Sequence, residues 1–412
     1  MNFIGIDFGT SNSLAALGGT FASFPDGKIS NPTVIYFPQK SKQHYVGNEA
    51  IYKYLGELDE HLPVGRLMLS IKSLLPEANF DYTNVTGFGR QTPEDMAARF
   101  IVKMKEYAEK QFAVKFDGAV LGRPVEFNEL AETRLADAAR QAGFREVSFR
   151  LEPVAAALSY ELTTSVSGTV CVVDLGGGTS DICIIETAPD RVEKADRASD
   201  IKAVSGVNQA GDELSSRIMR QKLAPRFGAG SIFHSLGKEL PFPIHLIERI
   251  SKWHRINMLK DHRFIGDILE IKRTSDRPED IARLYELISY NYGYELFQAI
   301  DTAKKELSAA EETRIRFRPL DLREHLTREE FEVIAQPVCD RIKDAINEAL
   351  RRASLSASAI NRVLVTGGTS QIPLIYRMIA EIFGEEKILK MDYYSSVASG
   401  LGTIAARLNK QN

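Results

Sequence analysis

Two related stretches decide the fold of this chain: residues 173–181 read VDLGGGTSD, and residues 5–13 read GIDFGTSNS. Each lies at the end of a short apolar run, which predicts a buried strand, and each passes from an aspartate into a glycine-containing turn. A third apolar run, residues 363–365, leads into TGGTSQIP at 366–373. Three strands that end in glycine turns, with helical patterns between them, predict an α/β architecture with at least two sheets.

The helical patterns have recognisable ends. Thr92 is predicted to cap one helix, and Gly143 is placed to stop another that begins near Asn128. Two further amphipathic stretches, at about 285–308 and 327–353, predict long helices.

The composition is that of an ordinary globular chain. Its 412 residues carry a formal charge of −3, and 44% of them are hydrophobic. Because there is no basic excess, neither nucleic acid nor an anionic membrane is an expected partner. Three cysteines cannot build a disulfide framework, and the N-terminal residues do not have the pattern of a signal peptide. We therefore expect a cytoplasmic protein.

The two acidic turns predict a phosphate site. Their glycines and hydroxyls would let backbone N–H groups approach phosphate oxygens closely. Facing each other, the turns could hold a polyphosphate from both sides, while Asp7 and Asp174 hold the water shell of a magnesium ion. The alternative is that Asp and Gly simply form tight turns, which explains either turn alone but explains the set poorly.

The third turn predicts a place for the rest of a nucleotide, because Gly367 and Gly368 would let adenine or ribose lie against the backbone. A predicted helix supplies a matching polar face, made of Asp301, Lys304, Lys305 and Ser308. Ordinary solvated charges would show the same spacing, so this face is a weaker signal than the two acidic turns.

These three turns, in this order, resemble the ATPase region of the seventy-kilodalton heat-shock chaperones, the DnaK type, within the actin-like and sugar-kinase superfamily. Three further stretches are similar to the chaperones in particular: Ile71-Lys72, LEPVAAA at 151–157 and AKKELS at 303–308. The likeness covers essentially the whole chain and is greatest to the short YegD-type members. It implies the actin-like ATPase fold, with two lobes of duplicated ribonuclease-H-like subdomains around a nucleotide cleft.

The resemblance also implies a domain organisation. Lobe I is expected to span residues 1–163, with 391–412 returning to it, and lobe II to span 164–390. A peripheral subdomain is expected at about 213–322. It contains the less regular region 225–283, which includes Trp253.

Four residues receive catalytic roles from the resemblance. Lys72 would place a cation beside the γ-phosphate and its attacking water, and Glu152 would align that water. Thr179 would contact the γ-phosphate, and Asp181 would accept a proton from the water. Taken without the resemblance, Lys72 would be read as a surface lysine and Glu152 as a carboxylate at the end of a strand.

The resemblance implies ATP or ADP and Mg²⁺ as ligands, with K⁺ as a further candidate cation and with Asp7 and Asp174 acting on the metal through water. Gln371 stands where the family has an arginine that stacks on adenine, which would weaken nucleotide binding by about 1–2 kcal/mol. The predicted nucleotide-binding residues are Gly9, Thr10, Ser11, Asn12, Gly176, Gly177, Gly178, Thr179, Gly211, Asp301, Lys304, Lys305, Ser308, Gly367, Gly368, Thr369 and Gln371.

The predicted function is that of a chaperone-like ATPase that binds Mg-ATP between two lobes and hydrolyses it slowly. The sequence ends at Asn412, before the linker and peptide-binding domain of a complete chaperone, so a client protein or co-chaperone is the expected partner. We expect a monomer or weak oligomer. Three alternatives remain at this stage: an actin-like filament protein, a nucleotide-binding scaffold with negligible turnover, and a small-molecule kinase.

Two cysteines flank the second acidic turn. Cys171 and Cys183 are symmetrical about Gly177, so a hairpin centred on Gly177 would make them cross-strand neighbours. The hypothesis is an oxidation-sensitive pair, and the alternative is two inert buried thiols.

Overall fold

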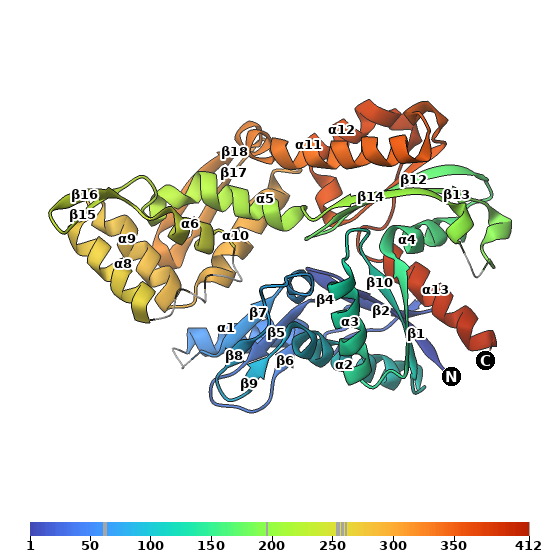
Figure 1. Cartoon of the computed structure of the whole chain (residues 1–412), viewed down its shortest axis with the longest axis horizontal. Coiled ribbons are helices and arrows are strands. Elements are labelled where there is room, and N and C mark those ends of the chain that lie inside the picture. Colours follow the sequence, from blue (N-terminus) through green and yellow to red (C-terminus); the bar gives the residue numbers. More distant parts are fainter. Residues whose placement is uncertain (61–63, 195–196, 253–255, 257–258, 260–261, 412) are drawn as a thin grey trace. The chain divides into compact units, whose positions relative to one another are not determined.

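The computed structural model describes residues 1–60, 64–194, 197–252, 256, 259 and 262–411 (Figure 1). Contacts between Cα atoms divide the chain into two compact units, which are described separately. Unit 1 comprises Met1–Gly211, Arg341–Ser370 and Ile375–Asn412, and unit 2 comprises Asp212–Asp340 and Gln371–Leu374.

The first sheet of unit 1 is built on β1. This strand runs parallel to β10 and antiparallel to β2, and the order is β11-β10-β1-β2-β3, with β4 also paired to β2. β1 is buried on both faces, which explains its nearly continuous apolar sequence. The strands are β1 (Phe3–Phe8), β2 (Asn12–Leu17), β3 (Thr20–Phe21), β4 (Asn31–Pro32), β10 (Gly118–Arg123) and β11 (Glu146–Leu151).

The second sheet of unit 1 has the order β14-β13-β12-β19-β20. β12 and β13 form an antiparallel hairpin, and β19 pairs parallel to β12. Its strands are β12 (Gly168–Leu175), β13 (Ser180–Thr187), β14 (Ile201–Val207), β19 (Arg362–Thr366) and β20 (Ile388–Lys390).

Two helices join these sheets. α13 (Ser396–Gln411) packs on β1, β2 and β10, while α4 (Glu152–Glu161) packs on β12 and β13 and against α13 (Figure 1). The backbones approach closely, since a Cβ added to Gly5 would lie 2.4 Å from the backbone of Gly402. Any larger residue at Gly5 would therefore push α13 away from the first sheet.

The other face of the first sheet is covered by α2 and α3. Phe100 and Leu135 from these helices share a core with Ile4, Ile6 and Phe8. A capping box at Thr92 and Asp95 opens α2, and Gly143 (φ +83°) follows the end of α3, as predicted. The remaining helices and strands before β10 are α1 (Gly47–Asp59), α2 (Pro93–Phe112), β5 (Val34–Phe37), β6 (Tyr45–Val46), β7 (Arg66–Leu69), β8 (Thr83–Val85) and β9 (Gly89–Gln91), and α3 (Glu129–Gln141) follows β10.

Unit 2 consists of small hairpins and helices. The region 225–283 is more regular than expected, although Trp253 lies outside the described residues. The elements are α5 (Gly211–Ile218, whose first residue belongs to unit 1), β15 (Ile232–Ser235), β16 (Lys238–Pro241), α6 (Ile244–Ile250), α8 (His262–Thr274), α9 (Pro278–Ser289), α10 (Gly293–Glu306), β17 (Glu312–Phe317) and β18 (Leu322–Thr327).

The long helix predicted at 285–308 is wrong as a single helix. α9 ends at Ser289, and α10 begins at Gly293, because Asn291 adopts a left-handed backbone (φ +62°) that interrupts the helical hydrogen bonds.

The helix predicted at 327–353 is confirmed as α11 (Arg328–Ala353), and α12 (Pro373–Phe383) follows β19. The α/β prediction is confirmed as well. Of the helices that the structure describes, none is both long and apolar enough to cross a bilayer.

The predicted cross-strand cysteine pair is wrong. Leu175 pairs with Ser180, so the hairpin centre lies between Gly177 and Gly178 rather than on Gly177. Cys171 therefore pairs with Ile184, and Cys183 pairs with Val172. Because side chains alternate along a strand, this shift places the two thiols on opposite faces of the sheet.

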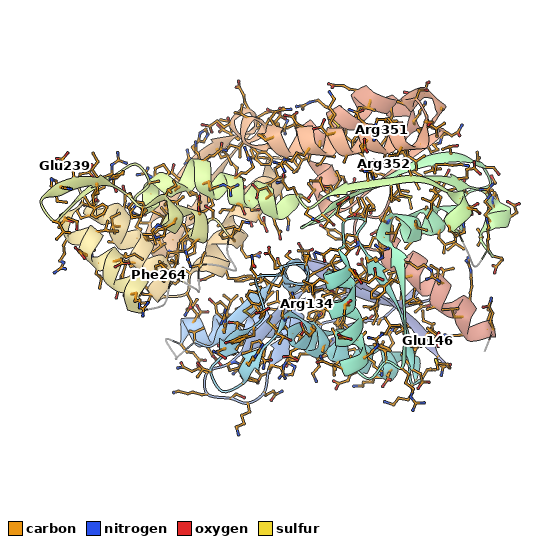
Figure 2. The ribbon with its side chains drawn as sticks, in the orientation of Figure 1. Arg134, Glu146, Glu239, Phe264, Arg351 and Arg352 are labelled. Carbon is orange, nitrogen blue, oxygen red and sulfur yellow. The ribbon has the colours of Figure 1, made fainter. Side chains whose placement is uncertain are left out.

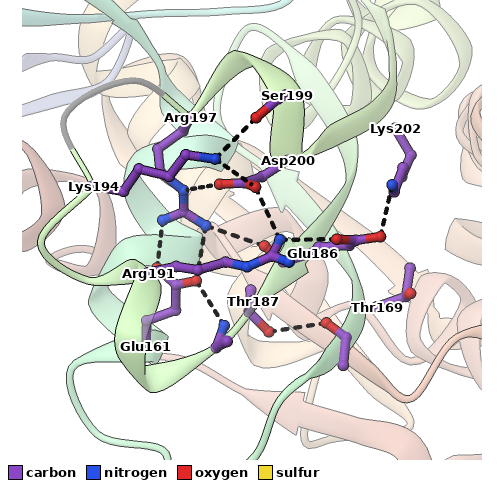
Figure 3. Close-up of polar contacts among 12 residues, drawn as sticks. Glu161, Thr169, Glu186, Thr187, Arg191, Lys194, Arg197, Ser199, Asp200 and Lys202 are labelled. Carbon is purple, nitrogen blue, oxygen red and sulfur yellow. Dashed lines mark hydrogen bonds and ion pairs between the residues drawn. The ribbon is translucent and has the colours of Figure 1, made fainter.

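A buried ion-pair network ties the end of α4 to the segment between β13 and β14 (Figure 3). The Glu161 carboxylate accepts two hydrogen bonds from the Arg197 guanidinium, at 2.5 and 2.8 Å. Arg197 Nε also donates to Asp200, which is paired with Arg191 and Lys194. The Glu161 side chain is 0% exposed, so its charge depends on these partners.

The β15–β16 hairpin contains an unusual turn. Leu236 (φ +50°) and Gly237 (φ +75°) form a two-residue loop with positive φ at both positions, which is type I′ geometry. Leu236 is 99% exposed, so no packing compensates for its backbone strain. Glu239 follows this turn on β16 (Figure 2).

Leu236→Asn is expected to raise the free energy of unfolding of unit 2 by about 1 kcal/mol, because Asn tolerates positive φ far better than Leu. Urea unfolding followed by circular dichroism measures this change. Leu236→Val is the matched control and should be less stable than the wild type, because a β-branched residue is more strained at this φ. An Asn variant no more stable than the wild type would show that the turn is not strained.

Candidate functional site

The first acidic turn is the corner between β1 and β2, with Asp7 near the end of β1. Thr33, a buried residue, holds this corner in place. Its backbone N–H donates to Ser11 O at 2.9 Å, and its hydroxyl donates to Gly9 O at 2.8 Å. Thr33 could not be predicted as a site residue, because nothing in its local sequence signals this long-range contact. Of the predicted phosphate residues here, Thr10 is buried and Ser11 is exposed.

The second acidic turn is the corner between β12 and β13. The Gly176 N–H donates to Thr179 O at 3.0 Å and closes the turn. Asp174 and Asp181 are directly opposite each other on the two strands. This arrangement is unfavourable when both carboxylates are charged, because they repel each other. Asp181 accepts hydrogen bonds from the Thr179 side chain and, at 2.5 Å, from the Val125 N–H.

The two corners meet inside unit 1. A Cβ added to Gly178 would lie 2.7 Å from Thr10 Oγ1, so the tip of the second corner touches the first. The charge of Asp7 also acts on Asp174. Residues about 170 positions apart in the sequence therefore converge on one place.

Lys72 and Glu152 lie beside these corners. Lys72 is on a short 3₁₀ turn (Ile71–Leu74), and Glu152 begins α4. The Lys72 Nζ and Glu152 Oε1 atoms are 2.5 Å apart, and the two residues are 4% and 7% exposed. Lys72 is thus a buried, ion-paired residue and not a surface lysine.

The segment that carries Lys72 is clamped by Arg134 on α3, which is labelled in Figure 2. The Arg134 guanidinium donates to the carbonyl oxygens of Leu75 and Glu77 at 3.1 Å each, and to Phe80 O at 3.3 Å. Arg134 could not be predicted to do this, because an arginine within an amphipathic helix usually faces solvent.

The site holds more carboxyl groups than cationic groups. Burial, followed by the charge of Glu152, raises the pKa of both Asp7 and Asp181 to about 7. The same causes raise the pKa of Asp174 well above its usual value. Burial by itself would lower the pKa of Lys72, but the charges of Glu152 and Asp7 outweigh it and raise that pKa overall. Four carboxyl groups thus surround one lysine, and a bound cation would relieve their repulsion.

The third turn packs on the second corner. Gly367 (φ +81°) lies so close that a Cβ there would be 2.1 Å from Leu175 O. The Thr369 hydroxyl donates to Gly176 O at 2.7 Å, and the Gly211 N–H donates to the same oxygen at 3.4 Å. The structure thus brings Gly211, Gly367 and Thr369 to the acidic corners.

The other predicted nucleotide residues belong to unit 2. Asp301 and Lys304 form an ion pair at 2.8 Å on α10, and the Ser215 hydroxyl bonds to both. Ser308 lies just past α10, which ends at Glu306, and its backbone N–H donates to Lys305 O at 3.1 Å. Lys305 and Gln371 are exposed. That these residues complete one site with unit 1 stays a prediction.

Comparison with known proteins supports the resemblance found in the sequence. The family model described as Hsp70 protein matches residues 71–207 and 291–411. The chain is 27% identical over 414 aligned residues to the chaperone protein DnaK of Thermus thermophilus, and 26% identical over 388 to that of Mycoplasmopsis synoviae. These alignments cover 96% and 93% of this chain, but only 59% and 54% of the two relatives.

The family match covers Lys72, Glu152, the second acidic corner and the third turn, while the first corner and residues 208–290 lie outside it. The α/β architecture with several mixed sheets is that of the actin-like ATPase fold. The resemblance to the seventy-kilodalton chaperones is therefore confirmed: the chain belongs to the Hsp70 family.

Proposed function

We propose that this chain binds Mg-ATP between the first and second acidic corners and hydrolyses it slowly, as a chaperone-like nucleotide switch. The observation that carries the proposal is the meeting of Thr10 and Gly178 beside the buried Lys72–Glu152 pair. Backbone N–H groups at both turns would bind the β- and γ-phosphates. Family membership and DnaK relatives that match 96% of the chain support the same function.

The residues at the corners fit a hydrated magnesium ion. Within the described part of the chain, no three acidic, His or Cys side chains converge closely enough to bind a metal directly. Mg²⁺ commonly keeps several waters, and carboxylates such as Asp7 and Asp174 would hold those waters by hydrogen bonds. When bound there, the ion would supply positive charge that offsets the negative charge of the phosphates. K⁺ is a further candidate cation that these carboxyl groups could bind.

In the proposed mechanism, the protein positions water and neutralises charge, which is most of what phosphoryl transfer requires. The Lys72 ammonium group would face the γ-phosphate and the attacking water, and the Glu152 carboxylate would align that water. Thr179 would donate to a γ-phosphate oxygen. Asp181 would accept the water's proton, for which its pKa of about 7 is suitable near neutral pH.

Nucleotide binding and phosphate release together test this proposal. Isothermal titration calorimetry should show ATP binding that requires Mg²⁺, and a phosphate-release assay should show slow turnover. ATP binding without turnover would favour the scaffold alternative, which the exposed Gln371 supports. Transfer of phosphate to a small acceptor would favour a kinase, and ATP-dependent light scattering would favour a filament.

The raised carboxyl pKa values predict a pH dependence for magnesium binding. Asp7 and Asp181 are protonated in the folded chain below about pH 7 and charged above it. Without metal, these raised pKa values make the free energy of unfolding fall as the pH rises from about 4 to about 7. The reason is that the two carboxyl groups lose their protons at a lower pH in the unfolded chain than in the folded chain. Mg²⁺ binds the charged forms, so it should raise the melting temperature more at pH 8 than at pH 6.

Thermal melts with and without Mg²⁺ at both pH values check this prediction. Asp7→Asn should reduce the pH dependence of the Mg²⁺ effect. An equal or smaller Mg²⁺ effect at pH 8 would contradict the prediction.

We propose that a chaperone role would involve a client protein or co-chaperone, because the relatives that this chain matches are chaperone proteins. We also propose that the protein functions in a reducing compartment such as the cytoplasm. Its buried free thiols, Cys171, Cys183 and Cys339, are consistent with this. Co-sedimentation with an unfolded model protein, with and without ATP, would show whether this chain binds clients itself.

A further inference from the structure

Unit 2 contains a cavity of about 580 Å³ between α10 and the β17–β18 hairpin. We call it the hairpin groove. One wall is α10, where Ala299, Thr302 and Ala303 leave room beside the helix. The other wall is the exposed face of β17, which carries Arg314 and Arg316.

The hairpin places two like charges opposite each other, because Arg316 on β17 is directly opposite Arg323 on β18. Arg314, on the same face of β17, is opposite His325. Like charges at opposite positions of an antiparallel pair destabilise it. In the part of the chain that the structure describes, no carboxylate forms an ion pair with Arg314 or Arg316. The local stability of the hairpin does not explain these two arginines.

The acidic residues of the groove are already engaged. Glu306 accepts a hydrogen bond from the Thr313 hydroxyl, and Glu312 Oε2 lies 3.0 Å from His325 Nε2. These carboxylates would repel a phosphate and an acidic side chain alike, but their remaining lone pairs can accept N–H groups from a peptide backbone, which a phosphate does not offer. A lining with both arginines and carboxylates therefore suits a peptide better than an inorganic anion.

We propose that the hairpin groove binds an extended acidic segment of a partner protein. Arg314 and Arg316 are two positions apart on one strand face, so their Cα atoms are about 7 Å apart. An extended peptide presents its residues i and i+2 on one side at the same spacing. Two carboxylates in that register would pair with the two arginines, which suit this contact because a guanidinium binds a carboxylate through two hydrogen bonds.

Fluorescence anisotropy with two labelled peptides tests the proposal. Both peptides contain two glutamates among alanines and serines. In one the glutamates are separated by a single residue, and in the other they are adjacent and point to opposite sides. The spaced peptide should bind about tenfold more tightly, because it makes two charge-assisted contacts instead of one. Its binding should weaken as salt is added.

Arg316→Glu should abolish binding of the spaced peptide. Arg145→Glu makes the same change of charge at an exposed residue of unit 1 and should bind like the wild type. If Arg316→Glu does not fold, Arg316→Thr is the second variant. It removes the Arg316–Arg323 repulsion and should lose about tenfold in affinity while its melting temperature stays the same or rises. A purely structural arginine would instead lower the melting temperature when replaced.

Three results would overturn the proposal. The first is no binding of the spaced peptide to the wild type, and the second is equal binding to the wild type and Arg316→Thr. The third is displacement of the peptide by inorganic phosphate at equal concentration, which would identify the groove as a small-anion site.

Discussion

Lys72→Ala is expected to lower the rate of ATP hydrolysis by about 10²–10³-fold while Mg-ATP still binds. Lys72 is buried, its pKa is raised by the charges of Glu152 and Asp7, and it lies beside the two acidic corners. It is therefore a fixed positive charge at a buried position, and such a charge stabilises a transition state more than an exposed lysine can. Phosphate release under single-turnover conditions measures the effect.

Two controls separate catalysis from folding. Lys115→Ala removes an exposed lysine of the same unit and should hydrolyse ATP at the wild-type rate. Lys72→Arg keeps the charge but changes its geometry, so its rate should lie between those of the wild type and the alanine variant. Calorimetry must show that each variant still binds nucleotide. Wild-type turnover by Lys72→Ala would remove Lys72 from the mechanism.

Arg197→Leu is expected to lower the free energy of unfolding by about 3–5 kcal/mol. The substitution removes both hydrogen bonds that Arg197 donates to the buried Glu161 carboxylate, and among the described residues it leaves the hydrogen bond from the Ala188 N–H. Urea denaturation followed by circular dichroism measures the change.

A double variant makes this prediction specific. Arg197→Leu combined with Glu161→Leu removes the stranded charge and should recover most of the lost stability, because apolar residues often replace a buried ion pair without loss. Arg351→Ala, at an exposed arginine in Figure 2, should leave the midpoint unchanged. A double variant as unstable as Arg197→Leu would show that packing, and not the buried charge, is the cause.

The acidic corners could be predicted from the sequence because their signal is local. Nine consecutive residues contain the end of a buried strand, an aspartate and glycines, and this pattern indicates both the turn and its phosphate-binding chemistry. The structure brings 5–13 and 173–181 together. The ends of α2 and α3 were predictable for the same reason, since caps depend on only a few neighbouring residues.

Features that depend on distant contacts could not be predicted in this way. Lys72 is paired with Glu152, 80 positions later in the sequence, and Thr33 and Arg134 act through backbone carbonyls far away in the sequence. The cysteine hypothesis failed by a single residue of hairpin register, which is enough to move a side chain to the other face.

A crystal structure with Mg²⁺ and a non-hydrolysable ATP analogue tests the central claim most directly. The β- and γ-phosphates should accept hydrogen bonds from backbone N–H groups of both turns, around Thr10 and around Gly178, with magnesium-bound waters on Asp7 and Asp174. An analogue whose phosphates contact only one turn, or bind elsewhere, would contradict the account.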